Sequence, residues 1–239
     1  SRRLYTIYFL DLESQKLYNE KIENTTGSLV WANDNKTVFY SKKEDVTLRV
    51  NKVFKHKLNT DSKEDELIYE EKDESFSIGV SKSKSEKFLF INSRSTLTTE
   101  LRFLDANKPD DQFKVFNQRV EGHEYSISHF KDNFYIITNK DNSKNFKLMR
   151  TSLKNTNQKN WENIIEHRKK ILLEGIEIFN DFLVVIERDS GLVKMNVRKW
   201  DNSQNYYLPI EGETYSLSIG TNIDFKSKKL RYNFSSLNT

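Results

Sequence analysis

The sequence contains no cysteine, which excludes disulfide bonds, thiolate metal ligands and a cysteine nucleophile. Its 239 residues include only 7 glycines and 2 prolines, so the turns must be built largely from Asn, Asp, Ser and Lys. No apolar run approaches the roughly 18 residues of a membrane-spanning helix. The N-terminal residues also lack the apolar stretch of a signal peptide. These absences fit a cytoplasmic protein with no membrane partner.

Aromatic residues are abundant, with 16 Phe, 11 Tyr and 3 Trp making up 13% of the chain. Disordered chains are poor in aromatic residues, so this content predicts a folded protein. The 39 Lys and Arg against 35 Asp and Glu give a net charge of +4, with both signs interspersed. This pattern does not predict a nucleic-acid partner, because nucleic-acid-binding proteins concentrate basic residues on one face.

Short strands of alternating apolar and polar residues recur along the chain, separated by polar turns. The first strand of each group begins near residue 28, 76, 125, 175 or 215, at intervals of 48, 49, 50 and 40 residues. A four-stranded unit at this period predicts an all-β fold, a β-propeller of antiparallel blades. The physical reason is that stacking small twisted sheets around an axis buries both faces of each sheet. A β-sandwich with coincidental spacing is the alternative.

The pattern predicts a single β-propeller domain fragment over residues 1–239, with four full blades and two half blades. The blades cover approximately residues 28–70, 76–116, 123–165 and 174–210, and the half blades cover 1–20 and 214–236. Because neither half blade is a whole repeat, the chain is interpreted as a piece of a longer protein. The sequence leaves open whether the half blades pair with each other to close a five-bladed ring.

Several long motifs occur in a fixed order. They are residues 65–73 (DELIYEEKD), 95–105 (STLTTELRFLD), 122–129 (GHEYSISH), 172–179 (LLEGIEIF), 184–188 (VVIER) and 230–237 (LRYNFSSL). In this order they resemble the propeller of the oligopeptidase B (protease II) branch of the prolyl oligopeptidase family. The resemblance covers essentially the whole chain.

The resemblance implies a parent protein that is a serine endopeptidase and cleaves short peptides after basic residues. It also implies a seven-bladed propeller that gates access and filters substrates by size, a separate α/β-hydrolase domain, and no cofactor. The G-x-S-x-G elbow that carries the family's nucleophilic serine does not occur here. The chain is therefore expected to hold no catalytic residue and no metal, and to be inactive alone. Its implied partners are the parent's own hydrolase domain and short peptide substrates.

A free-standing β-propeller that serves as a protein-interaction scaffold is the rival function. The incomplete blades at both ends argue against this rival. A continuation of the reading frame into a domain that carries G-x-S-x-G would favour the peptidase, and a stop codon after Thr239 would favour the scaffold.

Residues 1–5 (SRRLY) resemble a family segment near the interface between propeller and hydrolase domain. In bacterial members an arginine there is placed to pair with a carboxylate of the hydrolase domain, and Arg3 is the matching position. The resemblance thus implies an interdomain contact at Arg3. A solvated basic side chain is the alternative interpretation.

Three further groups have both a functional and a structural interpretation. His123 and His129 would lie about 20 Å apart on one strand, so packing is favoured over a shared metal. The acids within residues 70–74 could form an acid–base pair or attract basic peptides, but the interleaved Lys72 favours a solvated loop between blades. The basic run at residues 167–170 is short and flanked by acids, which favours a surface loop.

Overall fold

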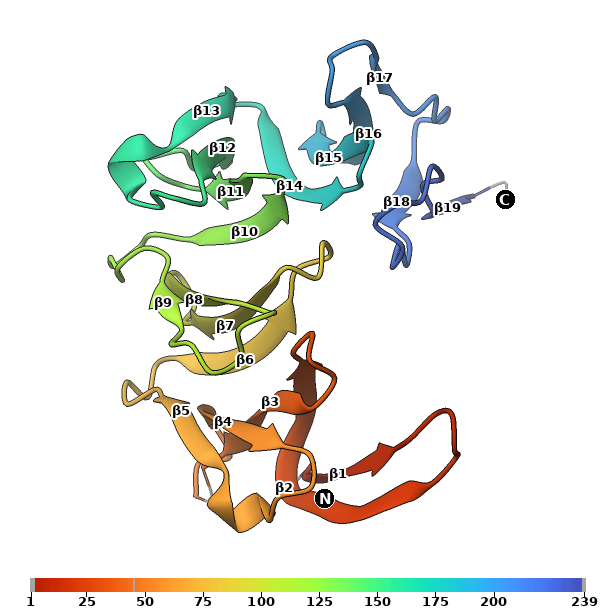
Figure 1. Ribbon diagram of the computed structural model, residues 1–239. Coiled ribbons are helices and arrows are strands. Elements are labelled where there is room, and N and C mark those ends of the chain that lie inside the picture. Colours follow the sequence, from red (N-terminus) through yellow and green to blue (C-terminus); the bar gives the residue numbers. More distant parts are fainter. Residues whose placement is uncertain (1–2, 45, 238–239) are drawn as a thin grey trace. The chain divides into compact units, whose positions relative to one another are not determined.

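The computed structural model describes residues 3–44 and 46–237, and the chain divides into two compact units, residues 1–122 and 123–239. Each unit is built from antiparallel β-sheets (Figure 1). Two short 3-10 helices, η1 (Ser62–Glu64) and η2 (Gln158–Asn160), lie in connections between strands. Within the described residues, no helix has the length and apolar character needed to cross a membrane.

The first unit contains a five-stranded and a four-stranded sheet, in which each strand pairs with its neighbour in sequence. The five-stranded sheet consists of β1 (Tyr5–Leu10), β2 (Leu17–Trp31), β3 (Thr37–Lys43), β4 (Val50–Lys57) and β5 (Glu66–Glu70). The four-stranded sheet consists of β6 (Ser77–Lys82), β7 (Phe88–Arg94), β8 (Thr99–Asp105) and β9 (Lys114–Val115).

The second unit contains two four-stranded sheets and a two-stranded sheet. The first sheet consists of β10 (Tyr125–Phe130), β11 (Asn133–Thr138), β12 (Lys147–Ser152) and β13 (Glu162–Ile165). The second consists of β14 (Ile171–Ile178), β15 (Phe182–Asp189), β16 (Leu192–Lys199) and β17 (Asn205–Tyr207). The two-stranded sheet pairs β18 (Tyr215–Ile219) with β19 (Tyr232–Ser236).

The predicted all-β class with antiparallel four-stranded sheets is confirmed, because three sheets have four strands in sequence order. The first sheet differs from the prediction. The half blade at residues 1–20 was expected to be separate from the blade at residues 28–70, but the 15-residue β2 runs through both. β2 pairs with β1 along its first part and with β3 along its second part. As a result, the N-terminal hairpin is continuous with the first sheet.

A bulge within β2 explains how one strand serves both neighbours. The pairing with β3 shifts register between Thr25 and Leu29, and Asn24 and Gly27 have φ angles of 58° and 78°. Glycine adopts such positive φ angles at little cost, which lets the strand bend without ending. A Cβ atom at Gly27 would lie 3.2 Å from the ring of Tyr5, so the close approach of β1 also favours glycine there.

The turns are built from Asn, Asp and Ser, as the shortage of glycine predicted. In the β2–β3 turn, Asn35 has a φ angle of 54°, and Asp34 Oδ1 accepts hydrogen bonds from the backbone N–H groups of Lys36 and Thr37. In the β6–β7 turn, Ser83 Oγ accepts a hydrogen bond from the Phe88 N–H group. Side-chain acceptors of this kind stabilise tight turns without glycine.

Apolar side chains fill the space between the sheets within each unit. In the first unit the core between the two sheets includes Ala32, Phe39, Val53, Leu89, Ile91 and Leu104. In the second unit one core joins the two four-stranded sheets, and Phe130 stacks on Trp200 with ring centroids 4.0 Å apart. A further core there includes Phe179, Val184, Met195 and Leu217, and Leu217 belongs to the two-stranded sheet. Burial of both sheet faces is what the repeat predicted.

Candidate functional site

Arg3, the predicted interdomain residue, lies just before β1, and its side chain is exposed. The backbone carbonyl oxygen of Arg3 accepts a hydrogen bond of 3.1 Å from Nζ of Lys43, at the end of β3. Ser1 and Arg2, from the same motif, lie outside the described residues.

The acidic stretch after β5 is different from the solvated loop that the sequence predicted. Glu71 is buried, with 4% of its surface exposed. Its carboxylate accepts hydrogen bonds from Arg119 Nη2 (2.5 Å), Ser93 Oγ (2.6 Å) and the Tyr69 hydroxyl (2.7 Å). The solvated-loop interpretation is therefore wrong for Glu71, because these donors replace water around its carboxylate. Glu70 and Glu74 are exposed, as predicted.

The hydrogen bonds to Glu71 decide its charge. Burial by itself raises the pKa of a carboxyl group, but the bonds from Arg119, Ser93 and Tyr69 outweigh burial and lower the pKa of Glu71 to about 2. A carboxylate held ionised in this way cannot exchange protons near neutral pH. Glu71 is thus suited to holding Arg119 in place and unsuited to acid–base chemistry.

Two arginines fix the connection between β5 and β6. The guanidinium of Arg119 lies over the ring of Phe76, 3.6 Å from its centroid. Arg49 donates to the backbone carbonyl oxygens of Glu71, Asp73 and Phe76. The cation–π contact of Arg119 and the backbone hydrogen bonds of Arg49 together restrain this connection.

A cavity of about 590 Å³ lies beside this connection. Its lining includes the side chains of Asp73, Phe76 and Arg119, together with the turn of residues 95–98. The turn is closed by a hydrogen bond from the Ser95 N–H group to the Thr98 carbonyl oxygen. The motifs at residues 65–73 and 95–105 therefore lie close together in the first unit.

Both histidines of the GHEYSISH motif have packing positions in the second unit. His123 is 7% exposed, stacks on Tyr125, and makes a 2.9 Å hydrogen bond through Nε2 with Thr138 Oγ1. His129 is 6% exposed, and its Nε2 lies 2.6 Å from the carbonyl oxygen of Lys131. Burial, and then the charge of Lys140, lower the pKa of His123. These contacts agree with the predicted packing role.

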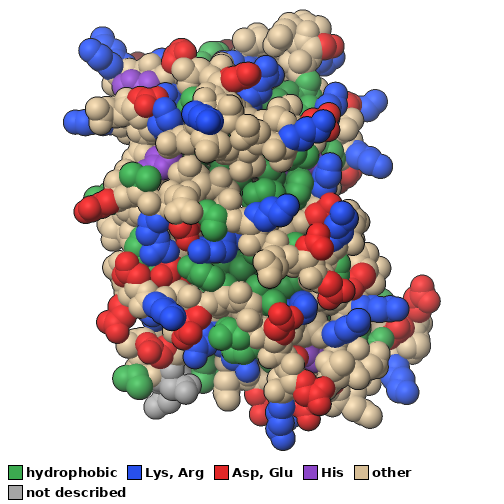
Figure 2. All heavy atoms as spheres, turned by 60° about the vertical axis from the view of Figure 1, so that its left-hand side comes forward, with side chains coloured by type: hydrophobic (Ala, Val, Ile, Leu, Met, Phe, Trp, Pro, Cys, Tyr) green, Lys and Arg blue, Asp and Glu red, His purple; other side chains and the backbone are tan. Residues whose placement is uncertain are grey.

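No group of three or more His, Cys, Asp or Glu side chains in residues 3–44 and 46–237 is arranged to hold a metal ion. Figure 2 shows Lys and Arg side chains interspersed with Asp and Glu on the face that it draws.

The basic run at residues 167–170 is a surface turn that contains one paired arginine. Lys169 and Lys170 are exposed, but Arg168 Nη2 lies 2.5 Å from Oε1 of Glu187, which is 1% exposed. The Tyr207 hydroxyl also donates to Glu187, at 2.8 Å. The run lies in a surface turn as predicted, but Arg168 has the further role of pairing with a buried carboxylate.

The sequence did not reveal the partners of the buried carboxylates of Glu71 and Glu187. Glu71 follows Tyr69 by two positions, and side chains at this spacing share one face of a strand. That spacing was the available signal, because the half-buried Tyr69 packs against the core and marks an inward face. The partner Arg119 lies 48 residues away, and the sequence carries no sign of that pairing.

Comparison with known protein families gives one match that covers the chain. Residues 1–239 match the family described as prolyl oligopeptidase, N-terminal beta-propeller domain. A Pseudoxanthomonas mexicana protein named dipeptidyl aminopeptidase BI is 35% identical over 238 residues, which cover 100% of this chain and 33% of that protein. Protease 2 of Moraxella lacunata is 33% identical over 193 residues, which cover 80% of this chain and 27% of that protein.

Solved structures agree with this match. Oligopeptidase B from Leishmania major superposes with a TM-score of 0.92 at 25% identity, over 100% of this chain and 35% of that chain. Oligopeptidase B from Trypanosoma brucei, in its closed form with covalently bound antipain, gives a TM-score of 0.89 at 27% identity and covers 34% of that chain. The matches confirm the predicted β-propeller class. This chain spans about one third of the length of these relatives.

Proposed function

The chain belongs to the prolyl oligopeptidase family, through its N-terminal β-propeller domain, and from this premise we propose that it is the non-catalytic propeller portion of an oligopeptidase B-like serine endopeptidase. The observation that carries the proposal is the family match along residues 1–239, together with the similarity to oligopeptidase B structures. Residues 1–239 form one part of that propeller, and the parent is cytoplasmic.

In this proposal the chemistry resides on an α/β-hydrolase domain of the parent, and the propeller controls access to it. The absence of a G-x-S-x-G elbow from residues 1–239 supports this division of labour. The substrates are short peptides cleaved after basic residues, and the propeller excludes longer or folded chains. A comparison of kcat/KM for short and long peptides with the same arginyl cleavage site tests the filter. Equal values for both lengths would contradict it.

Arg3 is the proposed contact between the propeller and the catalytic domain. Its exposed side chain, just before β1, supports this role. Arg3→Glu in the full-length parent should lower kcat/KM and increase the population of the open arrangement, which small-angle X-ray scattering measures. Arg231→Glu serves as a surface-charge control of the same kind. If Arg3→Glu changes neither activity nor opening, Arg3 has no such role.

A second activity is suggested by the name of one relative, a dipeptidyl aminopeptidase. Such an enzyme removes two residues from a free N-terminus, whereas an endopeptidase also cleaves acetylated peptides. Assaying the parent on matched free and N-acetylated arginyl peptides distinguishes the two. Cleavage of the acetylated peptide supports the endopeptidase, and loss of cleavage on acetylation supports the dipeptidyl aminopeptidase.

A further inference from the structure

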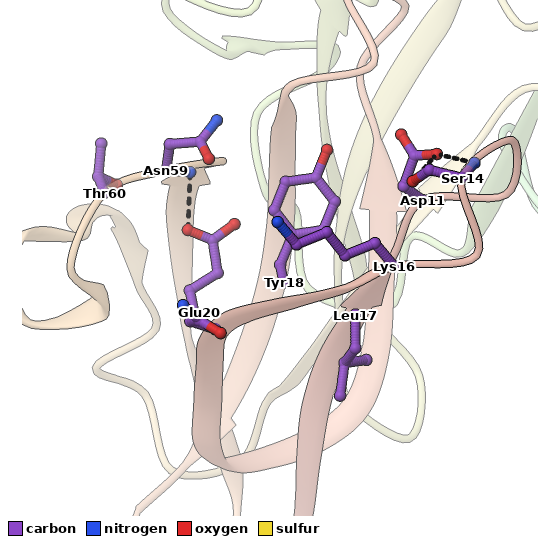
Figure 3. A pocket seen from close by; sticks show the side chains of 9 residues that line it. Asp11, Ser14, Lys16, Leu17, Tyr18, Glu20, Asn59 and Thr60 are labelled. Atoms are coloured by element: carbon purple, nitrogen blue, oxygen red, sulfur yellow. Dashed lines mark hydrogen bonds between the residues drawn. The ribbon is translucent and has the colours of Figure 1, made fainter.

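A cavity of about 550 Å³ lies in the first unit, between the β1–β2 hairpin and the loop that follows β4. This volume is within the range of pockets that hold small ligands. Figure 3 shows nine lining residues, with Glu20 and Asn59 on one side and Asp11 and Ser14 on the other. None of the motifs that identify the family contributes a residue to this lining.

One carboxylate oxygen of Glu20 accepts a hydrogen bond, and the other has no partner among the described residues. Its Oε2 accepts a 2.7 Å hydrogen bond from the backbone N–H group of Asn59, which Figure 3 marks. Its Oε1 is buried and has no hydrogen-bond partner among the described residues. Only 13% of the Glu20 side chain is exposed. A buried acceptor that lacks a donor is costly, so this oxygen favours a ligand that supplies one.

A buried group of polar side chains lies next to Glu20. Behind it, His56 is fully buried, and its Nε2 lies 4.0 Å from Glu20 Oε2, too far for a hydrogen bond. His56 Nδ1 lies 2.7 Å from Oδ1 of Asp65, whose other carboxylate oxygen accepts a 2.8 Å bond from the Tyr40 hydroxyl. The side chain of Asp65 is 3% exposed.

This cluster contains two carboxylates and a single imidazole. The hydrogen bond of His56 goes to Asp65, so the imidazole supplies no donor to Glu20. Buried charges are stable only when they are paired and hydrogen-bonded. His56 Nε2 lies at ion-pair distance from Glu20 Oε2 but leaves Glu20 Oε1 without a donor.

On the opposite side of the cavity, the carboxylate of Asp11 already has hydrogen-bond donors. Oδ1 of Asp11 already accepts hydrogen bonds from the N–H groups of Glu13 and Ser14 and from the Ser14 hydroxyl. These bonds stabilise the β1–β2 turn. Among the lining carboxylates, Glu20 Oε1 is the oxygen that is both buried and without a hydrogen-bond partner in the described part of the chain.

We propose that this cavity is a binding site for an organic cation with N–H donors, an alkylammonium or a guanidinium group, which Glu20 Oε1 receives. The positive charge balances the cluster behind Glu20, and the N–H group satisfies the buried oxygen. The ring of Tyr18 and the side chain of Leu17 line the same cavity and provide apolar surface for the carbon chain of the ligand. The group comes either from a free amine or from a basic side chain of a peptide.

The alternative occupant is Lys16. Lys16 is the one cation among the nine lining residues, all of which the structure describes, and Figure 3 shows its side chain extending past Tyr18. If its ammonium group moved to Glu20, the chain would fill its own site. Lys16→Met separates this alternative from the proposal.

Isothermal titration calorimetry on the 239-residue chain tests the proposal, with n-butylammonium and methylguanidinium as probes and n-butanol as the neutral control. The wild-type chain should bind both cations and not n-butanol. Glu20→Gln keeps an acceptor for Asn59 but removes the charge, and should weaken cation binding by about tenfold or more. Glu13→Gln changes an exposed carboxylate in the neighbouring turn and should leave binding unchanged.

A second pair of probes distinguishes the two sources of the cation. Tighter binding of a capped tripeptide with a central lysine than of n-butylammonium supports the site and assigns it to a peptide side chain. The reverse order supports the site and assigns it to a free amine. A matched peptide with norleucine in place of lysine should not bind in either case.

Three results would overturn the proposal. They are equal cation binding by wild-type and Glu20→Gln chains, equal binding of n-butanol and n-butylammonium, and failure of the wild-type chain to bind any cation. In the last case, binding by Lys16→Met alone would identify Lys16 as the occupant. Circular dichroism of each variant, with the wild-type spectrum expected, establishes that a loss of binding is not a loss of fold.

Discussion

Arg119 Nη2 lies 2.5 Å from Oε2 of Glu71, although the two residues are 48 positions apart in the sequence. The pair ties the β5–β6 connection to the segment that follows β9. Only 5% of the Glu71 side chain and 27% of the Arg119 side chain are exposed. Glu71 depends on this ion pair, because removal of Arg119 would leave its carboxylate buried without a counter-charge.

Glu71→Gln should therefore destabilise the chain substantially. Glutamine retains an acceptor oxygen but removes the shortest of the three ion pairs of Arg119, whose other partners are Asp73 at 3.7 Å and Glu100 at 3.8 Å. We expect a loss of about 2–3 kcal/mol in the free energy of unfolding. Urea denaturation followed by circular dichroism measures this loss. Glu70→Gln is the matched control, since Glu70 is exposed and 3.6 Å from Lys52, and should change stability by less than about 0.5 kcal/mol. Equal effects of both variants would contradict the assigned role.

The same carboxylate should make stability depend on pH. The pKa of Glu71 is about 2 in the folded chain, below its ordinary value of 4.5. A lowered folded-state pKa contributes stability that is complete above the unfolded-state value and is lost as the pH falls through the folded-state value. The stability difference between wild-type and Glu71→Gln chains should shrink as the pH falls from 4.5 toward 2. The difference isolates Glu71 from Asp141, whose pKa is also about 2 because of Lys140 and Lys147.

In the second unit, Arg168→Met should destabilise the chain by about 2–3 kcal/mol, because it leaves the carboxylate of Glu187 buried without a counter-charge. Lys169→Met removes the same charge from the neighbouring exposed residue and should change stability by less than about 0.5 kcal/mol. Thermal unfolding of the two variants side by side is the measurement. If Lys169→Met costs as much as Arg168→Met, the pairing with Glu187 is not what makes the basic run important.

Two glycines should respond in opposite ways to alanine. Gly27→Ala places a side chain at a φ angle of 78° and against the Tyr5 ring, and should cost about 1 kcal/mol or more. Gly79 lies inside β6, has no atom within 4 Å of an added Cβ, and should become neutral or slightly more stable as alanine. Urea denaturation of both variants checks this contrast. A neutral Gly27→Ala would show that the β2 bulge does not require glycine.

The repeat of strands was predictable because period-2 alternation and polar turns are local signals. The extent of β2 was not, because residues 19–27 (NEKIENTTG) are mostly polar and give no strand signal of their own. Ile22 is fully buried within that stretch, and pairing with β1 and β3 determines its conformation. Tertiary context overrides weak local preference in this segment.

Charged residues were harder to interpret than apolar ones. Glu71 and Glu70 are neighbours of identical type, yet one is buried and the other exposed, because the partner Arg119 comes from a distant segment. The cavity at Glu20 was invisible in the sequence for the same reason. Its carboxylate meets Asn59 and His56 only after β2 and β4 have taken their places on either side of β3.

The central claim is that this chain is the non-catalytic part of a serine peptidase. Turnover of an arginyl peptide substrate, measured in parallel for the isolated 239-residue chain and for the full-length parent, tests it most directly. We predict no turnover by the isolated chain, and turnover by the parent that a serine-directed inhibitor abolishes. Turnover by the isolated chain, or a parent that leaves the arginyl substrate intact, would contradict the claim.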